Sequence, residues 1–204
     1  MRKNLIKGSL LLGALTIAFS AVAQSASGNK APVHVDVAVM ATFEHAQVAQ
    51  INGNRFWPKG GAIDGSISIW KDIGFAFEVS GEHASNIQNN GVSLNLVSFM
   101  AGPRYSFRVS PAGESFHNRG PVRAFVQTLY GPTHASDGLF PGPTSLSTSA
   151  EAFTVLLGGG VDVPVRRGFG IRAVDAAWIH SDYSNHAEDV QNDFRLGFGA
   201  SYHW

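Results

Sequence analysis

Hydrophobic and polar residues alternate along most of this chain. In residues 193–204, aromatic and aliphatic side chains occupy the even positions, whereas small or polar side chains occupy the odd positions. Because successive side chains of a β-strand point to opposite faces, this pattern predicts a strand with one apolar and one polar face. The apolar face includes Trp204, the last residue of the sequence, which is unusual for a strand of a soluble protein.

Seven earlier segments show the same alternation, and residues typical of turns separate them. These segments are 33–44, 62–70, 74–83, 92–109, 122–133, 150–165 and 169–183. Together with 193–204 they predict eight strands and an all-β protein. The facing of the fifth strand stays open at this point, because Phe125 and Leu129 share a face with Arg123 and Gln127.

The predicted connections alternate in length. Those after the second and sixth strands are very short, whereas those after the odd-numbered strands are longer and include 46–60, 134–149 and 184–192. Bacterial outer-membrane barrels have short periplasmic turns and longer external loops. The connection 110–120 is longer than a periplasmic turn should be, but the other lengths predict an up-and-down barrel with its long loops outside the cell.

The composition limits the functions open to the chain. Lys and Arg together number 15, as do Asp and Glu, so no net charge attracts nucleic acid and we expect none as a partner. Charged residues make up 15% of the chain, below the roughly 25% of soluble domains. The absence of Cys excludes disulfides, Cys-ligated zinc and a lipoprotein acylation site.

Sparse charge also separates two kinds of eight-stranded barrel. If this chain formed a soluble, lipocalin-like barrel, its aliphatic and aromatic faces would point inward and its outer face would be mostly Ser, Gly and Thr. That outer face would have few Lys or Glu, whereas the surface of a soluble protein is rich in charged residues. In a membrane barrel the apolar faces meet lipid instead. The sequence therefore predicts an all-β, eight-stranded antiparallel up-and-down transmembrane β-barrel.

Residues 1–23 have the organisation of a secretory signal peptide. A basic start with Arg2 and Lys3 precedes an apolar core and a small-residue cleavage site that ends at Ala23. A membrane-anchor helix is the alternative, but the apolar core is far shorter than the roughly 20 residues needed to span a bilayer. We therefore expect a signal peptide at 1–23, a short N-terminal lead at 24–32 and the barrel at 33–204.

Several segments together resemble the small OmpA-type outer-membrane β-barrel family. They are Gly-Pro-Arg-Tyr-Ser-Phe at 102–107, Gly-Gly-Gly-Val-Asp-Val-Pro at 158–164, Ile171-Arg172 with Asp175, and the aromatic end. The resemblance implies a monomeric barrel in the bacterial outer membrane, in contact with outer-membrane lipid and lipopolysaccharide. It is specific for fold and location but weak for activity, because that family includes anchors, adhesins and many members of unassigned role.

The last strand also resembles the C-terminal assembly signal of bacterial outer-membrane proteins. Gly199, Tyr202 and Trp204 carry this resemblance, whereas Gly197 stands where the signal usually has a polar residue. It implies that the barrel-assembly machinery is a partner.

Alternation places a set of charged residues inside the barrel: Asp36, Asp64, Glu78, Arg104, Arg108, Asp162, Asp175 and Arg195. An eight-stranded barrel is just wide enough for side chains to fill, so we expect these charges to pair across the lumen in a structural role. Asp175 is expected inside because Val174, Ala176 and Trp178 then face lipid. Arg172 has the opposite parity and could join Asp175 only across a β-bulge.

Four histidines lie at the outer ends of the odd strands: His45, His83, His134 and His180. Two neighbours could just share a metal ion, but four around a rim could not, so we expect interfacial polar residues and neither metal nor cofactor.

His180-Ser181-Asp182 contains the residue types of a hydrolase triad. Consecutive strand residues point to opposite faces, so these three cannot form one triad among themselves.

The sequence therefore predicts a non-enzymatic outer-membrane barrel with a structural or surface-interaction role through its extracellular loops. Two alternatives stay open at this stage. One is a lipid-modifying enzyme of the outer leaflet, similar to lipid A deacylases, and the other is a narrow channel.

Overall fold

A computed structural model describes residues 34–47, 55–87, 91–109, 121–140, 145–183 and 190–204. The predicted signal peptide and N-terminal lead lie outside these residues, as do the centres of the long loops and the connection 110–120. These predictions are therefore not tested by the structure. No helix among the described residues is long and apolar enough to cross a membrane.

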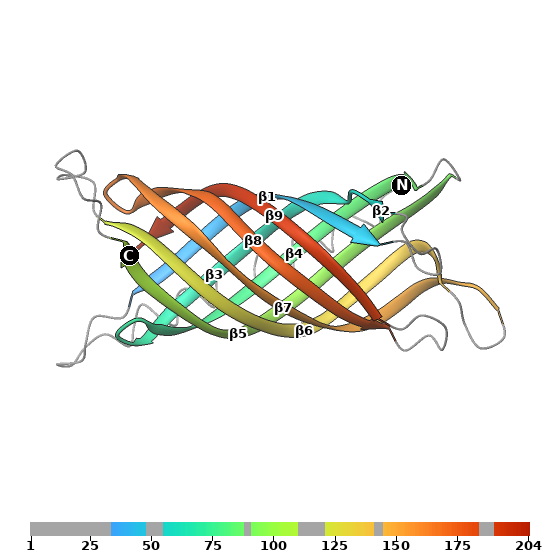
Figure 1. Ribbon diagram of the computed structural model, residues 1–204, viewed down its shortest axis with the longest axis horizontal. Coiled ribbons are helices and arrows are strands. Elements are labelled where there is room, and N and C mark those ends of the chain that lie inside the picture. Colours follow the sequence, from blue (N-terminus) through green and yellow to red (C-terminus); the bar gives the residue numbers. More distant parts are fainter. Residues whose placement is uncertain (1–33, 48–54, 88–90, 110–120, 141–144, 184–189) are drawn as a thin grey trace, which may run out of the picture. The chain divides into compact units, whose positions relative to one another are not determined.

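The described chain folds into one antiparallel sheet in which each long strand pairs with its neighbours in sequence (Figure 1). The strands are β1 (Val35–Gln47), β2 (Arg55–Phe56), β3 (Lys59–Trp70), β4 (Ile73–Ile87), β5 (Val92–Val109), β6 (Val122–Phe140), β7 (Ser147–Arg166), β8 (Phe169–Tyr183) and β9 (Val190–His203). The two-residue β2 only extends the pairing at the end of β1. The eight long strands form the barrel that the alternation predicts.

The seam between β1 and β9 closes the barrel. Its register runs from the pair Asp36–His203 to the pair His45–Phe194. The amide of Trp204 continues the seam by donating to the carbonyl oxygen of Val35 at 2.9 Å. Closure pairs the backbone N–H and C=O groups of the two terminal long strands. Left unpaired, these groups could find no hydrogen-bond partner in lipid.

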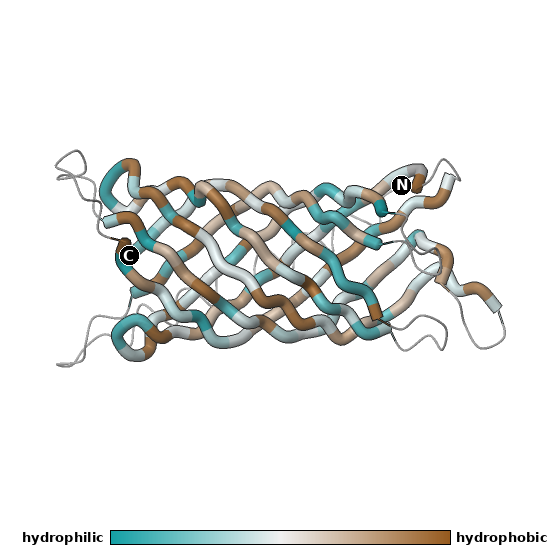
Figure 2. The backbone as a smooth tube through the Cα atoms, in the orientation of Figure 1, coloured by the Kyte–Doolittle hydropathy of each residue, from teal (hydrophilic) through white to brown (hydrophobic). Residues whose placement is uncertain are grey.

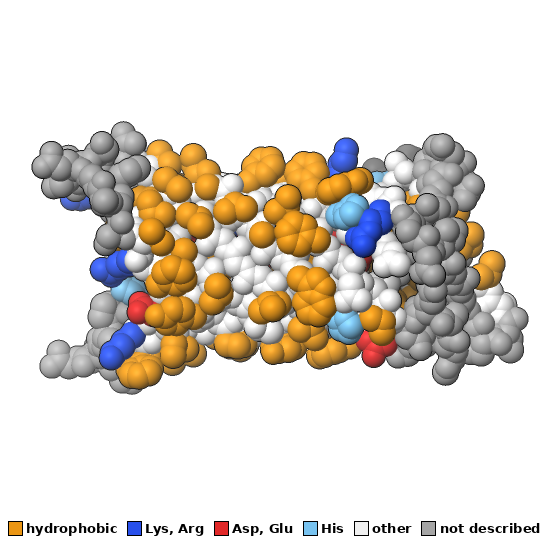
Figure 3. Space-filling view, viewed as in Figure 1, with side chains coloured by type: hydrophobic (Ala, Val, Ile, Leu, Met, Phe, Trp, Pro, Cys, Tyr) orange, Lys and Arg blue, Asp and Glu red, His pale blue; other side chains and the backbone are white. Residues whose placement is uncertain are grey.

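The barrel has a polar interior and an apolar outer surface. The inward-facing side chains of Asp64 in β3 and Arg195 in β9 are 1% exposed. The outward-facing side chains of Val39 in β1 and Phe198 in β9 are 58% and 55% exposed. Hydrophobic and hydrophilic residues alternate along the strands (Figure 2). In a space-filling view, hydrophobic side chains cover the middle of the visible face and charged side chains gather near its ends (Figure 3). This distribution is that of a transmembrane barrel and excludes a soluble, lipocalin-like one.

The two ends of the barrel differ in their connections. The start of β1, the end of β9 and the tight turns at Lys71–Asp72 and Arg167–Gly168 share one end, called here the turn end. The opposite end, the loop end, receives the long loops. Since outer-membrane barrels have short periplasmic turns, the turn end faces the periplasm and the loop end faces outward.

The hairpin of β6 and β7 is longer than the sequence suggests. Residues 134–149 are rich in Gly, Pro, Ser and Thr and were expected to form a loop, but β6 continues to Phe140 and β7 resumes at Ser147. Phe140 packs on Tyr183 of β8, with ring centroids 6.3 Å apart, and Ala135 is fully buried beneath. Packing of these side chains decides the strand state where local propensity is weak.

Candidate interaction surface at the loop end

The charges predicted for the interior lie inside the barrel, with one exception. The buried ones are Asp36, Asp64, Glu78, Arg104, Asp162, Asp175 and Arg195. Alternation also places Arg108 in this set, but its side chain is exposed. Arg108 lies one residue before the end of β5, where its ladder partner is Arg123, so β5 has reached the rim and water can solvate the guanidinium group.

Arg172 is a buried charge that alternation did not include. The register of β8 shifts against β7 between Val161 and Asp162, and against β9 between Arg172 and Asp175. This irregularity is the β-bulge that the opposite parity of the two charges requires, and it places Arg172 and Asp175 inside at 1% and 2% exposure. Two opposite charges at i and i+3 within an otherwise apolar strand are the sequence signal for it.

Arg172 organises an ion-pair network that spans the lumen. Its Nε and Nη2 donate to Asp162 at 2.9 and 3.0 Å, and its Nη1 donates to Asp64 at 2.7 Å. Arg104 donates to the same Asp64 carboxylate from the other side. The ring of Phe125 lies against both guanidinium groups, whose central carbons are 4.2 and 4.4 Å from its centroid. The facing of the fifth strand is thereby decided: Phe125 points inward.

A second cluster surrounds Arg195. Its Nη2 donates to Glu78 at 2.7 Å, and its Nη1 lies 3.6 Å from Glu82, which also accepts a hydrogen bond from Thr42 at 3.2 Å. The ionic side chains of this cluster are at most 2% exposed. Removing one charge of such a cluster would leave its partner buried and uncompensated, so the cluster is a fixed part of the fold.

Apolar side chains occupy much of the remaining lumen. One layer consists of Ala76, Met100, Leu129, Leu156, Ala177 and Ile179, and another of Leu96, Ala135, Ala152 and Tyr183. An interior cavity between these layers and Arg195 measures about 20 Å³, which is room for a single water molecule. Side chains therefore fill the described interior, and its geometry gives the channel alternative no support.

The structure also separates the residues of the His180-Ser181-Asp182 tripeptide. Ser181 is buried inside the barrel, where its hydroxyl lies 3.0 Å from that of Thr154. His180 lies on the outer face and bonds Asn192, and Asp182 is exposed. In the part of the chain that the structure describes, no three His, Asp or Glu side chains are grouped so that they could hold a metal ion.

Four outward-facing histidines form a belt near the loop end. Three of them bond a polar side chain on the next strand through Nδ1: His83 bonds Asn95 at 2.7 Å, His134 bonds Glu151 at 2.5 Å, and His180 bonds Asn192 at 3.0 Å. The fourth, His45, accepts from Arg55 of β2 at 3.3 Å. Figure 3 shows imidazole groups where the hydrophobic surface gives way to charged residues. The belt marks the outer boundary of the lipid-facing surface.

A pocket of about 400 Å³ opens beside this belt, between the strands that carry Lys59 and His83. Phe56 and Trp57 form its aromatic wall, and Trp57 is 56% exposed. The Trp57 ring packs on the imidazole of His45 at 4.6 Å, and the same imidazole bonds Arg55. This rim pocket therefore combines aromatic surface with the cation Lys59 just beyond the apolar band. Arg55 does not line the pocket but lies next to it, bonded to the imidazole on which Trp57 packs. The sequence did not indicate it, because the predicted loop 46–60 gave these residues no defined position.

Comparison with solved structures identifies the architecture. Neisserial surface protein A (NspA) aligns with a TM-score of 0.54 and 18% identity, over 82% of this chain and 96% of its own. Ail, the attachment invasion locus protein of Yersinia pestis, aligns with a TM-score of 0.50 and 14% identity, over 85% of this chain and all of its own. The chain has the fold of the small eight-stranded outer-membrane barrels. No protein-family model and no curated protein sequence matches it.

This fold and the apolar outer band place the protein in the bacterial outer membrane. The resemblance to the small outer-membrane barrels is thereby confirmed for architecture and location. The low sequence identities carry no further function across.

Proposed function

We propose that this protein is a non-enzymatic outer-membrane barrel that acts by surface interaction at its loop end, and that lipopolysaccharide is a ligand of the rim pocket. The observation that carries the proposal is that Lys59 and the exposed Trp57 line one pocket where the lipid-facing surface ends, with Arg55 held next to them by its bond to His45.

The chemistry of the rim pocket fits an acylated, phosphorylated sugar. Arg and Lys form charge-assisted hydrogen bonds with phosphate oxygens, and these are stronger than bonds between neutral groups. Trp at a membrane boundary covers apolar groups while its N–H stays near water. His45 and His83 add polar ring edges to the same part of the rim.

The test compares basic residues near a Trp at the loop end with a Lys beside a Trp at the turn end of the same barrel. Replacing both Arg55 and Lys59 with Gln is expected to weaken lipopolysaccharide binding to the purified, folded protein by about tenfold or more, because two charge-assisted contacts are lost. Lys71→Gln is the matched control, since the Lys71 ammonium lies 4.9 Å from the Trp70 ring at the turn end. Equal affinity in both variants would contradict the proposed ligand.

Two measurements test the absence of catalysis and conduction. Lipid A from cells with and without the protein is expected to give identical mass spectra, because Ser181 is inside the barrel while His180 is outside. Planar-bilayer recordings are expected to show no steady conductance, because side chains such as Leu129 and Leu156 fill the lumen. Loss of acyl chains from lipid A, or stable current steps, would contradict the corresponding part of the proposal.

We also propose that the protein works as a monomer that the barrel-assembly machinery recognises through its last strand. Pairing of β1 with β9 closes the sheet within one chain, which supports a monomer. Tyr202 packs edge-to-face on Trp204 at 4.4 Å and on Phe169 at 4.7 Å, so the proposed assembly signal is an aromatic cluster at the turn end. Gly199, the third residue of that signal, faces Met40 across the seam.

A further inference from the structure

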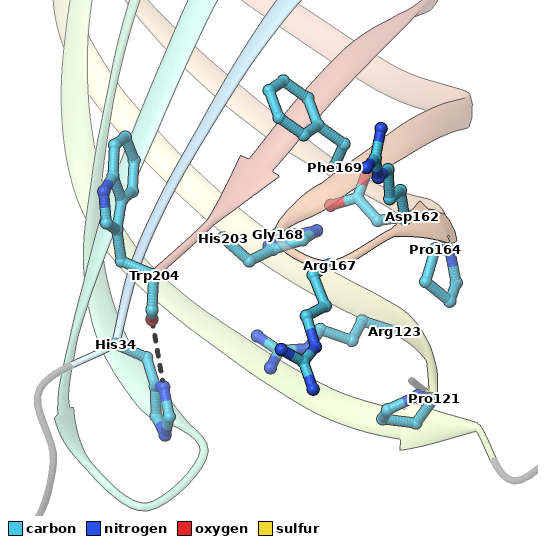
Figure 4. A pocket seen from close by; sticks show the side chains of 11 residues that line it. His34, Pro121, Arg123, Asp162, Pro164, Arg167, Gly168, Phe169, His203 and Trp204 are labelled. Atoms are coloured by element: carbon cyan, nitrogen blue, oxygen red, sulfur yellow. Dashed lines mark hydrogen bonds between the residues drawn. The ribbon is translucent and has the colours of Figure 1, made fainter. Parts of the chain in front are cut away.

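A second pocket lies at the turn end, away from the loop-end surface described above. It measures about 340 Å³, and three guanidinium side chains line it: Arg123 from β6, and Arg166 and Arg167 from the end of β7 and its turn. Arg123 and Arg167 extend into the pocket from different elements (Figure 4). Three cations around one cavity indicate an anionic ligand.

The acidic side chains of this region are already engaged by other groups. Asp162, which lines the pocket, accepts two hydrogen bonds from Arg172. Asp36 lies 2.5 Å from Nδ1 of His203, and its only contact with Arg123 is long, at 3.5 Å. Arg123 is therefore only weakly paired.

Among the described residues, the side chains of Arg166 and Arg167 have no hydrogen-bond or ion-pair partner, although the backbone of Arg166 pairs with Phe169 in the sheet. The three guanidinium groups consequently outnumber Asp162, the acidic side chain among the described residues that line the pocket.

The turn that presents Arg167 is fixed to the last strand. Gly168 adopts a φ of 75°, which a side chain would strain, and its carbonyl oxygen accepts a hydrogen bond from the amide of His203 at 2.7 Å. A Cβ at Gly168 would also lie 2.9 Å from the Tyr202 ring. The backbone that positions Arg167 is thus held before any ligand arrives.

Aromatic side chains on the outer surface border the same pocket. Phe169 and Trp204 both line it and are 58% and 59% exposed. Phe169 packs edge-to-face on Tyr202, which continues the aromatic surface to Trp204. Aromatic residues of outer-membrane barrels gather at the two levels where lipid meets water. A ligand in this pocket would therefore place an anionic group on arginines and an apolar part on aromatic rings.

We propose that the turn-end pocket binds the phosphate group of an inner-leaflet phospholipid. Guanidinium groups bind phosphate oxygens in pairs of parallel hydrogen bonds, so Arg123 and Arg167 can hold one phosphate between them. Free phosphate offers the same chemistry to the arginines but has nothing to place on Phe169 and Trp204. The adjacent aromatic surface therefore favours a lipid over the free ion.

The test uses the full-length mature protein, folded in zwitterionic detergent, and two probes. Short-chain phosphatidylglycerol supplies a lipid phosphate, and inorganic phosphate supplies the free ion. Arg123→Gln with Arg167→Gln is expected to weaken phosphatidylglycerol binding by about tenfold or more for each guanidinium removed. Lys71→Gln, in the other turn of the same end, is the control and is expected to leave the affinity unchanged.

The outcomes separate the two sources of phosphate. Phosphatidylglycerol binding that depends on the arginines and resists millimolar inorganic phosphate supports the lipid site. Displacement by inorganic phosphate at equal affinity would overturn the lipid as ligand, and equal binding by the double variant and the control would overturn the site. If the double variant does not fold, Arg167→Gln alone provides the test, because the Arg167 side chain bonds no described residue and its replacement is expected to leave the barrel folded.

Discussion

Arg172 and Asp64 form a hydrogen-bonded ion pair of 2.7 Å across the barrel lumen, although 108 positions separate them in the sequence. The pair joins β8 to β3, which are not neighbours in the sheet. Both side chains are 1% exposed, so each charge depends on the other in a place that water does not reach.

Replacing Arg172 with Met is expected to destabilise the barrel by about 3–5 kcal/mol, because Asp64 and Asp162 then lose a buried counter-charge. The free energy of unfolding in urea, measured on protein folded into lipid bilayers, gives the value. Arg108→Met is the control, since Arg108 is exposed and its loss leaves no buried carboxylate unpaired. Similar unfolding curves for the two variants would show that the buried network contributes little.

Two glycines of β9 are expected to respond differently to the same small substitution. A Cβ at Gly199 would lie 1.9 Å from the carbonyl oxygen of Val39 across the seam, whereas the nearest atom to a Cβ at Gly197 is 3.4 Å away. Gly199→Ala must therefore displace the backbone of β1 and is expected to cost about 1–3 kcal/mol, as overpacking does. Gly197→Ala should be nearly neutral. Unfolding measurements on both variants decide this, and equal stabilities would mean that the seam is more loosely packed than the structure shows.

Phe198→Arg is expected to destabilise the protein by about 2–4 kcal/mol, because Phe198 faces lipid near the middle of β9. Phe198→Leu keeps an apolar side chain there and is expected to lose only the packing of Phe198 on Phe43, whose ring centroid is 6.1 Å away. Urea unfolding in bilayers measures both. Comparable losses would assign the effect to aromatic packing rather than to lipid exposure.

Deleting residues 202–204 is expected to remove the protein from the outer-membrane fraction while leaving secretion intact. The deletion removes two members of the proposed assembly signal, together with the amide of Trp204 that bonds Val35 at the end of the seam. Fractionation and immunoblotting measure the distribution, and the unboiled gel mobility of the folded barrel reports closure. Trp204→Phe keeps an aromatic group and is the control, expected to behave as the unaltered protein. Normal abundance of the truncated chain in the outer membrane would rule out this role for the last residues.

The sequence by itself determined the number of long strands, their order and, for all but the fifth of them, the face presented to lipid. These properties follow from alternation, which is local, and from the lengths of the connections. Val39 and Phe198 point outward, and Asp64 and Arg195 point inward, as their parity requires. Sparse charge then decided between a soluble barrel and a membrane barrel.

Tertiary structure alone decided the features that depend on partners far apart in the chain. Parity could not place Arg172 inside, because only the bulge in β8 brings it into register with Asp64 and Asp162. It could not orient Phe125, whose ring is held inside by the two guanidinium groups it lies against. Both pockets likewise arise where different strands end together at a rim. Alternation specifies the face on which a side chain lies, but the contacts that this side chain makes are determined only when the sheet closes.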